Sequence, residues 1–278
     1  MQSAEKSADF LLEECYNTLW RRKMDSLKNI VLLIDADNTQ VLKIESVIRE
    51  ISTFGRIVVK RAYGNWKKMG LKSWEAELKR LAIKAEQQFD YVRGKNATDM
   101  ALAIDAVNLL HKSIYDAFVI VASDSDYTPL AIYLHESGVY VIGVGEKKTP
   151  ESFRNSCDEF VFLENIGDGA SEERKKPVQA SEEAERIDEA DDDPEAVHSL
   201  LRLAWDKYQD DEGYVNVSAA GQFIKRVKPD FDVRTFGYIK LPKFIEAFPD
   251  IYEMKRYPGK GKVTIVAYRC KSGRKKRG

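Results

Sequence analysis

The sequence has few cysteines and no long apolar run. Its three cysteines, Cys15, Cys157 and Cys270, lie far apart, and the three histidines do not cluster with them. This spacing argues against a disulfide framework and against a zinc site, and it favours a reducing, cytoplasmic compartment. The chain also lacks an apolar stretch of about eighteen residues and a leader with a basic cap, so we expect neither a membrane span nor a signal peptide.

Apolar and charged residues are both abundant, but the charge is unevenly distributed. Apolar residues make up 44% of the 278 residues and charged residues 32%, and the net charge is only −1. Residues 24–164 carry 18 basic and 20 acidic residues, residues 165–195 carry 4 and 12, and residues 196–278 carry 18 and 9. Positive charge concentrated on a short domain predicts a polyanionic partner, either a nucleic acid or an acidic protein surface.

Composition divides the chain into five expected segments. Between two regions with regular apolar patterns, the sequence loses its aromatic residues and gains Asp, Glu, Ser and Ala, a composition that does not bury a core. We expect an N-terminal helix over residues 1–26, an α/β domain over 27–164, an acidic flexible linker over 165–195, a winged-helix domain over 196–270 and a basic tail over 271–278.

The first region alternates short apolar runs with amphipathic stretches. Runs without polar alternation predict strands buried on both faces, and the order of the pattern predicts a parallel sheet covered by helices, a three-layer α/β fold. The expected strands are Ile30–Ile34, Ile57–Val59, Phe118–Val121 and Val139–Val144. The expected buried helix faces are Trp74, Leu78, Leu81 and Ala85, and Met100, Ala103, Ile104, Val107 and Leu110.

The last region has the order of a small winged-helix domain. We expect one helix over about residues 196–209, a second over 219–227 with Ser218 as its N-cap, and a third from Asp232 through Ile245. Two strands, Ile251–Tyr257 and Lys262–Tyr268, then flank a Pro-Gly turn as a hairpin.

Carboxylates gather where the predicted strands end. Asp35 directly follows one strand, Asp124 and Asp126 follow another, and Asp99 opens a helix. Ligands of open parallel sheets bind beyond the carboxyl ends of the strands, so we expect these acids at one edge. Each acid alone also fits an N-cap or a first-turn position, and Asp37 fits a supporting place beside them.

A group of acids without lysine or arginine among them predicts a bound cation. Neighbouring carboxylates repel one another unless a positive charge neutralises them. An all-oxygen set without His or Cys suits Mg²⁺ or Mn²⁺, and such an ion acts mainly on phosphates. The residues therefore predict hydrolysis of phosphodiester bonds.

Basic residues near the acids and in the last domain are candidate phosphate contacts. Arg61 and Lys95 lie on segments near the acidic edge, whereas Lys84 is better explained as an ordinary surface residue. Trp66 fits either base stacking or a buried core. In the last domain the candidates are Lys260 and Lys262 on the hairpin, together with Lys225, Arg226, Lys228, Arg234, Lys240 and Arg256.

Residues 27–164 resemble the NYN domains of the PIN-like nuclease superfamily. The resemblance rests on residues 31–38 (VLLIDADN), on RAYGNW from Arg61, on Lys95 with Asp99, and on residues 123–130 (SDSDYTPL). It implies a metal-dependent endoribonuclease with Asp35, Asp99 and Asp124 as metal ligands and Asp126 as a further ligand or supporting acid. It also implies that Asn38 positions substrate or water and that Ser123 contacts a phosphate.

Residues 196–269 resemble the LOTUS (OST-HTH) domain, a winged-helix module that binds RNA or protein. The resemblance rests on DEGYV from Asp211, on Ser218, on PDFD from Pro229 and on FGYIKL from Phe236. It implies RNA, single-stranded or structured, as a partner, with a protein partner as the other possibility and self-association left open. NYN and LOTUS domains occur together in RNA-processing proteins.

Two other functions compete with a ribonuclease. DADNT from Asp35 also fits the opening motif of haloacid-dehalogenase-like phosphatases, in which the first Asp is a nucleophile, but the acidic pair that these enzymes need after a later strand is missing here and Asp99 is left without a role. A PIN-like domain can also bind RNA or a partner without cutting it, and the basic module then does the work.

Overall fold

The computed structural model describes residues 27–89, 97–167, 194–258 and 264–271. The chain divides into two compact units, Met1–Asp168 and Gly169–Gly278, which are taken separately below. The expected N-terminal helix, the acidic linker except its ends, the basic tail after residue 271, and the candidate residues Lys95, Lys260 and Lys262 lie outside the described residues. None of the described helices has both the length and the apolar character needed to cross a bilayer.

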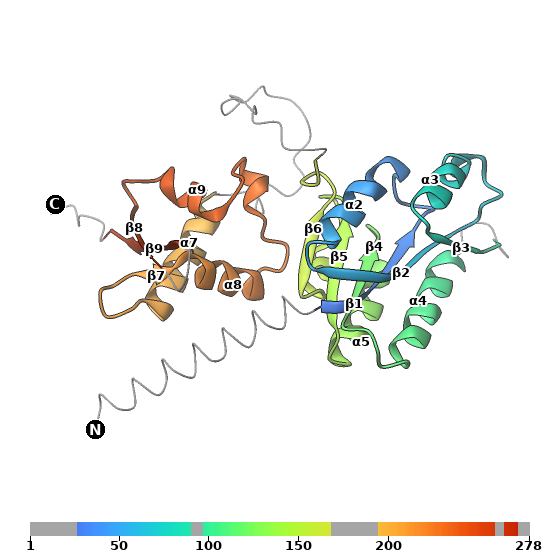
Figure 1. Cartoon of the computed structure of the whole chain (residues 1–278), viewed down its shortest axis with the longest axis horizontal. Helices are drawn as coiled ribbons and strands as arrows, with labels where there is room; N and C mark the ends of the chain where they lie inside the picture. Colours follow the sequence, from blue (N-terminus) through green and yellow to red (C-terminus); the bar gives the residue numbers. More distant parts are fainter. Residues whose placement is uncertain (1–26, 90–96, 168–193, 259–263, 272–278) are drawn as a thin grey trace. The chain divides into compact units, whose positions relative to one another are not determined.

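The first unit is built on a six-stranded, wholly parallel sheet (Figure 1). The strand order is β3-β2-β1-β4-β5-β6, so β1 and β4 lie side by side in the middle. The strands are β1 (Leu27–Asp35), β2 (Gly55–Gly64), β3 (Lys84–Gln87), β4 (Ala117–Val121), β5 (Tyr140–Gly145) and β6 (Glu159–Phe162). The parallel α/β fold predicted from the apolar runs is confirmed.

Helices cover both faces of this sheet and make two separate cores. Alternate residues of β1 point to opposite faces, as the period of two requires. Leu32 packs with α2 (Ile44–Ile51) and α3 (Trp74–Arg80), whereas Leu33 packs with α4 (Ala97–Leu110), α5 (Thr128–Glu136) and α6 (Glu151–Asn155). Single 3-10 turns stand at Val41–Lys43, Met69–Leu71 and Ser125–Tyr127. The result is the expected three-layer arrangement.

Two details of this unit differ from the prediction. Ala85 was expected on a helix face, but α3 ends at Arg80 and Ala85 lies in the short edge strand β3. The face of α4 is also different, because Leu102, Ala106 and Leu109 are buried while Met100 and Ile104 are exposed. Apolar residues occur on most sides of α4, so periodicity alone does not select its buried face.

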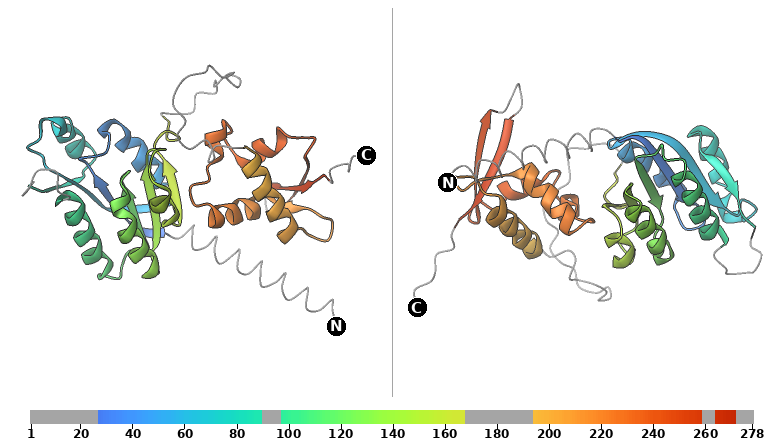
Figure 2. Two further views of the ribbon diagram at one scale, coloured as in Figure 1. Left: turned by 180° about the vertical axis from the view of Figure 1, so that it is seen from behind. Right: turned by 90° about the horizontal axis from the view of Figure 1, so that it is seen from below.

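The second unit is the winged helix predicted from the element order. Figure 2 shows its helices in orange, with the red hairpin alongside. Phe244, Tyr252 and Tyr268 are fully or almost fully buried at the centre of its core. The elements are α7 (Pro194–Tyr208), β7 (Val215–Asn216), α8 (Val217–Val227), a 3-10 turn (Val233–Phe236), α9 (Leu241–Glu246), β8 (Tyr252–Pro258) and β9 (Thr264–Cys270), with the antiparallel order β7-β9-β8.

The helix boundaries of the second unit differ from the prediction in two places. The N-cap of α8 is Asn216, whose side-chain oxygen accepts the N–H of Ser218, and not Ser218 itself. Asp232 does cap the next turn, but Gly237 adopts a left-handed conformation with φ of 80° and divides the expected third helix into a 3-10 turn and α9. Glycine reaches this backbone region without the steric cost that other residues meet.

Candidate active site

The predicted acids lie at the carboxyl edge of the two central strands. Asp35 is the last residue of β1, Asp124 follows the end of β4, and Asp99 stands in the first turn of α4. The negative charge of Asp124 acts on Asp99, and the charge of Asp99 acts on Asp35. Three segments that are distant in the sequence therefore bring carboxylates into one electrostatic group.

Asp35 is completely buried, although it carries an ionisable carboxyl group. Burial raises the pKa of Asp35 to about 6, and the charges of Asp99 and Asp37 add to this rise. Hydrogen bonds from the side chains of Asn38 and Tyr127 lower this pKa again. Asn38 Nδ2 donates to Asp35 Oδ2 over 3.0 Å, and the N–H of Asp37 donates to Oδ1 over 3.1 Å. The loop after β1 thus folds back onto the carboxylate that ends the strand.

Asp99 is half-buried and is hydrogen-bonded by a tyrosine from the 3-10 turn after β4. The hydroxyl of Tyr127 donates a hydrogen bond of 2.7 Å to Asp99 Oδ1. Burial raises the pKa of Asp99, and the neighbouring charges of Asp124 and Asp126 raise it further against the effect of this bond. Tyr127 is almost fully buried, and burial together with the charges of Asp35 and Asp99 raises the pKa of its phenol. Tyr127 was not among the predicted site residues.

The segment after β4 is shaped by its own side chains. Asp124 Oδ1 accepts the N–H of Asp126 over 3.1 Å and so caps the 3-10 turn Ser125–Tyr127. This is the N-cap role that the sequence also allowed for Asp124. Ser123 Oγ accepts the N–H of Glu146 over 3.0 Å and ties the end of β4 to the end of β5. Asp124 and Asp126 are both exposed, so these carboxylates face solvent.

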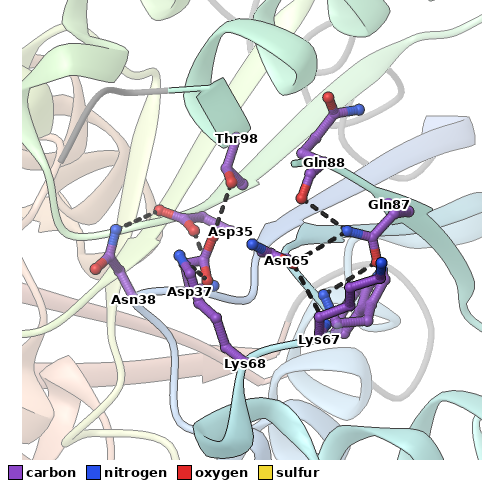
Figure 3. A network of polar contacts seen from close by, with 10 residues as sticks. Asp35, Asp37, Asn38, Asn65, Lys67, Lys68, Gln87, Gln88 and Thr98 are labelled. Carbon is purple, nitrogen blue, oxygen red and sulfur yellow. Dashed lines mark hydrogen bonds and ion pairs between the residues drawn. The ribbon is translucent and has the colours of Figure 1, made fainter. Parts of the chain in front are cut away.

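A lysine lies at the acidic edge, contrary to the sequence-based expectation. Lys68 Nζ lies 3.1 Å from Asp37 Oδ1, and Thr98 Oγ1 donates to Asp37 Oδ2 over 2.7 Å (Figure 3). Lys68 comes from the loop after β2, which is distant from Asp37 in the sequence and lies beside it in the folded domain. Asp37 therefore joins the loop after β1 to the start of α4 and to the loop after β2.

Arg61 and Lys84 are engaged within the domain. Arg61 Nη1 contacts both oxygens of Asp105, at 2.7 and 2.5 Å, and the hydroxyl of Tyr63 donates to the same carboxylate. Lys84 Nζ lies 2.5 Å from Glu86 Oε1. Asp105 of α4 therefore faces β2, and these contacts fix the rotation of α4. Arg61 thus joins α4 to the sheet.

Comparison with known proteins identifies both parts of the chain. The model of the NYN domain matches residues 29–164, and the model of the OST-HTH/LOTUS domain matches residues 190–264. The chain carries an NYN domain followed by a LOTUS domain. No curated protein sequence matches it.

Two solved structures are similar to part of the chain. A crystal structure of a protein of unknown function from Vibrio parahaemolyticus is 16% identical, covers 50% of this chain and 94% of its own, and has a TM-score of 0.42. A solution NMR structure of an uncharacterized protein from Nitrosomonas europaea is 23% identical, covers 38% and 93%, and has a TM-score of 0.26.

The carboxylates of the NYN domain fit a hard divalent cation by their chemistry, but they do not converge on one point. Among the described residues, no group of three or more His, Cys, Asp or Glu side chains is arranged to hold a metal ion. Asp35 and Asp99 are hydrogen-bonded to Asn38 and Tyr127 instead. The raised pKa values of Asp35 and Asp99 reflect burial among negative charges, an environment that a cation relieves.

The NYN domain also has neighbours of the acids that the sequence did not indicate. Lys67 and Phe89 make contact with each other beside Lys68, although 22 positions separate Lys67 from Phe89. Trp66, a candidate for base stacking, is partly buried, packs on Trp74 and donates its indole N–H to the carbonyl of Glu86. The RAYGNW motif drew attention to the loop after β2, but nothing in the sequence indicated that Phe89, which follows β3, lies beside this loop.

Proposed function

We propose that the protein is a metal-dependent ribonuclease that hydrolyses RNA phosphodiester bonds at the acidic edge of its NYN domain. One observation carries the proposal: Asp35, Asp99 and Asp124 come from three segments of an NYN domain and lie close enough for their charges to act on one another. The phosphatase alternative finds no support in the family match and leaves Asp99 unexplained.

In this proposal, Asp35, Asp99 and Asp124 hold Mg²⁺ or Mn²⁺, with Asp126 as a further ligand or a supporting acid. Such an ion, when bound, lowers the pKa of a water molecule and stabilises negative charge on the phosphoryl oxygens.

Other residues of the NYN domain position the substrate and the acids. Asn38, already bonded to Asp35, has an amide that orients the attacking water or the substrate. The Ser123 hydroxyl, which accepts a backbone N–H, retains its own proton for donation to a phosphate oxygen. Tyr127 keeps the Asp99 carboxyl turned toward the edge. Arg61 acts through α4 and Asp105 rather than on the substrate.

The LOTUS domain is proposed to hold the RNA that the NYN domain cuts, with domain boundaries at residues 27–164 and 196–270. Arg226 at the end of α8 and Lys240 before α9 are exposed. Arg234 and Arg256, also candidates, are paired with Asp232 and Glu246. The scarcity of cysteine supports action in the cytoplasm.

A cleavage assay on circular single-stranded RNA tests this proposal. We expect the full-length protein to open the circle with Mg²⁺ or Mn²⁺, because an endonuclease needs no RNA end. Asp124→Asn should lower the rate by about a hundredfold or more, since loss of a ligand removes several kcal/mol of transition-state stabilisation. An unchanged rate in EDTA, or full activity of Asp124→Asn, contradicts the proposal.

A further inference from the structure

Three side chains form a short exposed strip that begins at the acidic edge. Lys68 pairs with Asp37 of the edge, Lys67 is the next residue in the chain, and the Lys67 ammonium lies 4.9 Å from the centre of the Phe89 ring. Phe89 is 48% exposed, which is high for so large an apolar side chain. We call Lys67, Lys68 and Phe89 the Lys67–Phe89 strip.

The backbone beneath this strip is held in place by a set of amide contacts (Figure 3). Asn65 Oδ1 accepts the N–H of Lys67 over 3.3 Å and the side-chain amide of Gln87 over 3.2 Å. Gln87 Oε1 in turn accepts the N–H of Trp66, and the N–H of Gln88 donates to the carbonyl of Gly64. The loop after β2 is thus bonded to the end of β3, and this bonding places Lys67 beside Phe89.

The composition of the strip matches one kind of polymer. An exposed aromatic ring offers a stacking surface to a base, and two neighbouring ammonium groups offer contacts to successive phosphates. A duplex keeps its bases stacked inside, so only an unpaired strand presents a base to such a ring. Lys67 lies close enough to Phe89 to contact the phosphate of the nucleotide that stacks there.

We propose that the Lys67–Phe89 strip binds the unpaired RNA segment next to the bond that is cut, with a base stacked on Phe89 and the following phosphates on Lys67 and Lys68. This inference rests on the proposed function, because it assigns the substrate of that same edge as single-stranded. Lys68 exchanges its carboxylate partner for a phosphate when RNA enters. The strip then leads the strand from Phe89 toward Asp37.

Photo-crosslinking locates the RNA without requiring cleavage. Full-length protein carrying Asp124→Asn is irradiated with single-stranded RNA that contains 4-thiouridine, and the crosslinked peptides are identified by mass spectrometry. We expect crosslinks on the peptide that contains Phe89, and duplex RNA of the same sequence should give at most a fifth of this yield. Crosslinks confined to other peptides, or equal yields from the duplex, overturn the proposal and leave the nuclease assignment standing.

Cleavage kinetics provide the second readout. Phe89→Ala should raise KM for single-stranded RNA about tenfold with little change in kcat, whereas Phe89→Tyr should restore KM because it keeps the ring. Tyr133→Ala is the matched control, since Tyr133 on α5 is 42% exposed but belongs to the other side of the sheet. An unchanged KM for Phe89→Ala, in a protein that melts at the wild-type temperature, also overturns the proposal.

The two proposals fail in different ways. If Phe89 is crosslinked but no RNA is cleaved with any divalent ion, the strip binds RNA and the nuclease assignment is wrong. If RNA is cleaved and no crosslink falls on the strip, the nuclease assignment holds and the proposed role of the strip is wrong.

Discussion

Charges are arranged in opposite ways in the two domains. At the edge of the NYN domain, acids gather against one another, and the pKa values of Asp35 and Asp99 are raised. In the LOTUS domain, basic side chains are paired with acids of the same domain, as in Arg234 with Asp232 at 2.8 Å. Further pairs are Arg256 with Glu246, Lys255 with Glu212, and Arg269 with Glu253.

This difference shows how far net charge locates function. The excess of basic residues in the C-terminal third indicated a polyanion partner, but part of that charge is already neutralised on the folded surface. Exposed ion pairs of this kind contribute only about 0–1 kcal/mol each to the stability of the fold. Their main effect here is to reduce the positive potential that the basic residues present to a polyanion. At the acidic edge of the NYN domain, Lys68 pairs with Asp37, but the pKa values of Asp35 and Asp99 stay raised by burial and by the neighbouring acids. This imbalance is the stronger functional signal.

The largest expected effect comes from the uncompensated acids. Asp35→Asn and Asp99→Asn should each lower the RNA cleavage rate by about a hundredfold or more, because each removes a proposed metal ligand. Single-turnover kinetics at saturating Mn²⁺ measure the effect. The thermal unfolding midpoint should stay near that of the wild type, since Asn keeps the size of Asp. A variant that retains a tenth of the rate or more argues against that residue as a ligand.

Removing the LOTUS domain should have the next largest effect. A protein ending after residue 189 should show a KM for RNA raised about tenfold and a kcat within about twofold, because tethering raises the local concentration of substrate. Steady-state cleavage of one RNA at one salt concentration provides both constants. A fall in kcat with an unchanged KM indicates instead that the domain shapes the active site.

The paired charges of the LOTUS domain should appear in its stability. Burial alone raises the pKa of Asp232, but the hydrogen bonds and charge of Arg234 outweigh burial and hold that pKa below its usual value. The stabilisation that comes with a lowered carboxyl pKa is fully present above the ordinary value near 3.8. It is lost as the pH falls through the folded-state pKa.

Asp232→Asn should therefore lower the free energy of unfolding by about 1 kcal/mol at pH 7 and by almost nothing at pH 2. Chemical denaturation of the isolated LOTUS domain at several pH values measures this difference. A difference that persists at pH 2 shows that capping geometry, rather than charge, is responsible.

The smallest expected effect separates exposed from paired basic residues. Among the described residues, Arg226 and Lys240 form no ion pair, and both are exposed. Arg226→Ala should weaken RNA binding about threefold and reduce the slope of log affinity against log salt by about one. Arg256→Ala is the matched control, and we expect no change in slope because Glu246 already neutralises Arg256. Equal slopes for the two variants contradict this distinction.

The sequence predicted the architecture of both domains because it depends on patterns that are local. Apolar runs such as Phe118–Val121 become fully buried central strands, and a strand that ends in Asp35 places that acid at the edge. Where local pattern is ambiguous, the prediction was wrong. The rotation of α4 depends on Asp105 meeting Arg61 across the domain, and the break at Gly237 depends on a single left-handed residue.

The parts of the candidate site that escaped prediction depend on contacts between distant segments. Lys68 reaches Asp37 only because the loop after β2 folds over the end of β1, and Tyr127 reaches Asp99 only because α4 and the turn before α5 are neighbours. Phe89 follows a polar edge strand that the apolar pattern does not reveal. Such contacts between distant segments produce no periodic pattern in the sequence, so a single sequence does not predict them.

The most direct test of the contrast between the domains is RNA binding by each domain alone at matched salt. Fluorescence anisotropy with one labelled single-stranded RNA compares residues 27–167, carrying Asp124→Asn, with residues 190–278. We predict that the LOTUS domain alone binds this RNA at least about tenfold more tightly than the NYN domain alone. If the LOTUS domain binds no RNA while the NYN domain keeps the full-length affinity, the proposed division of cutting and holding is wrong.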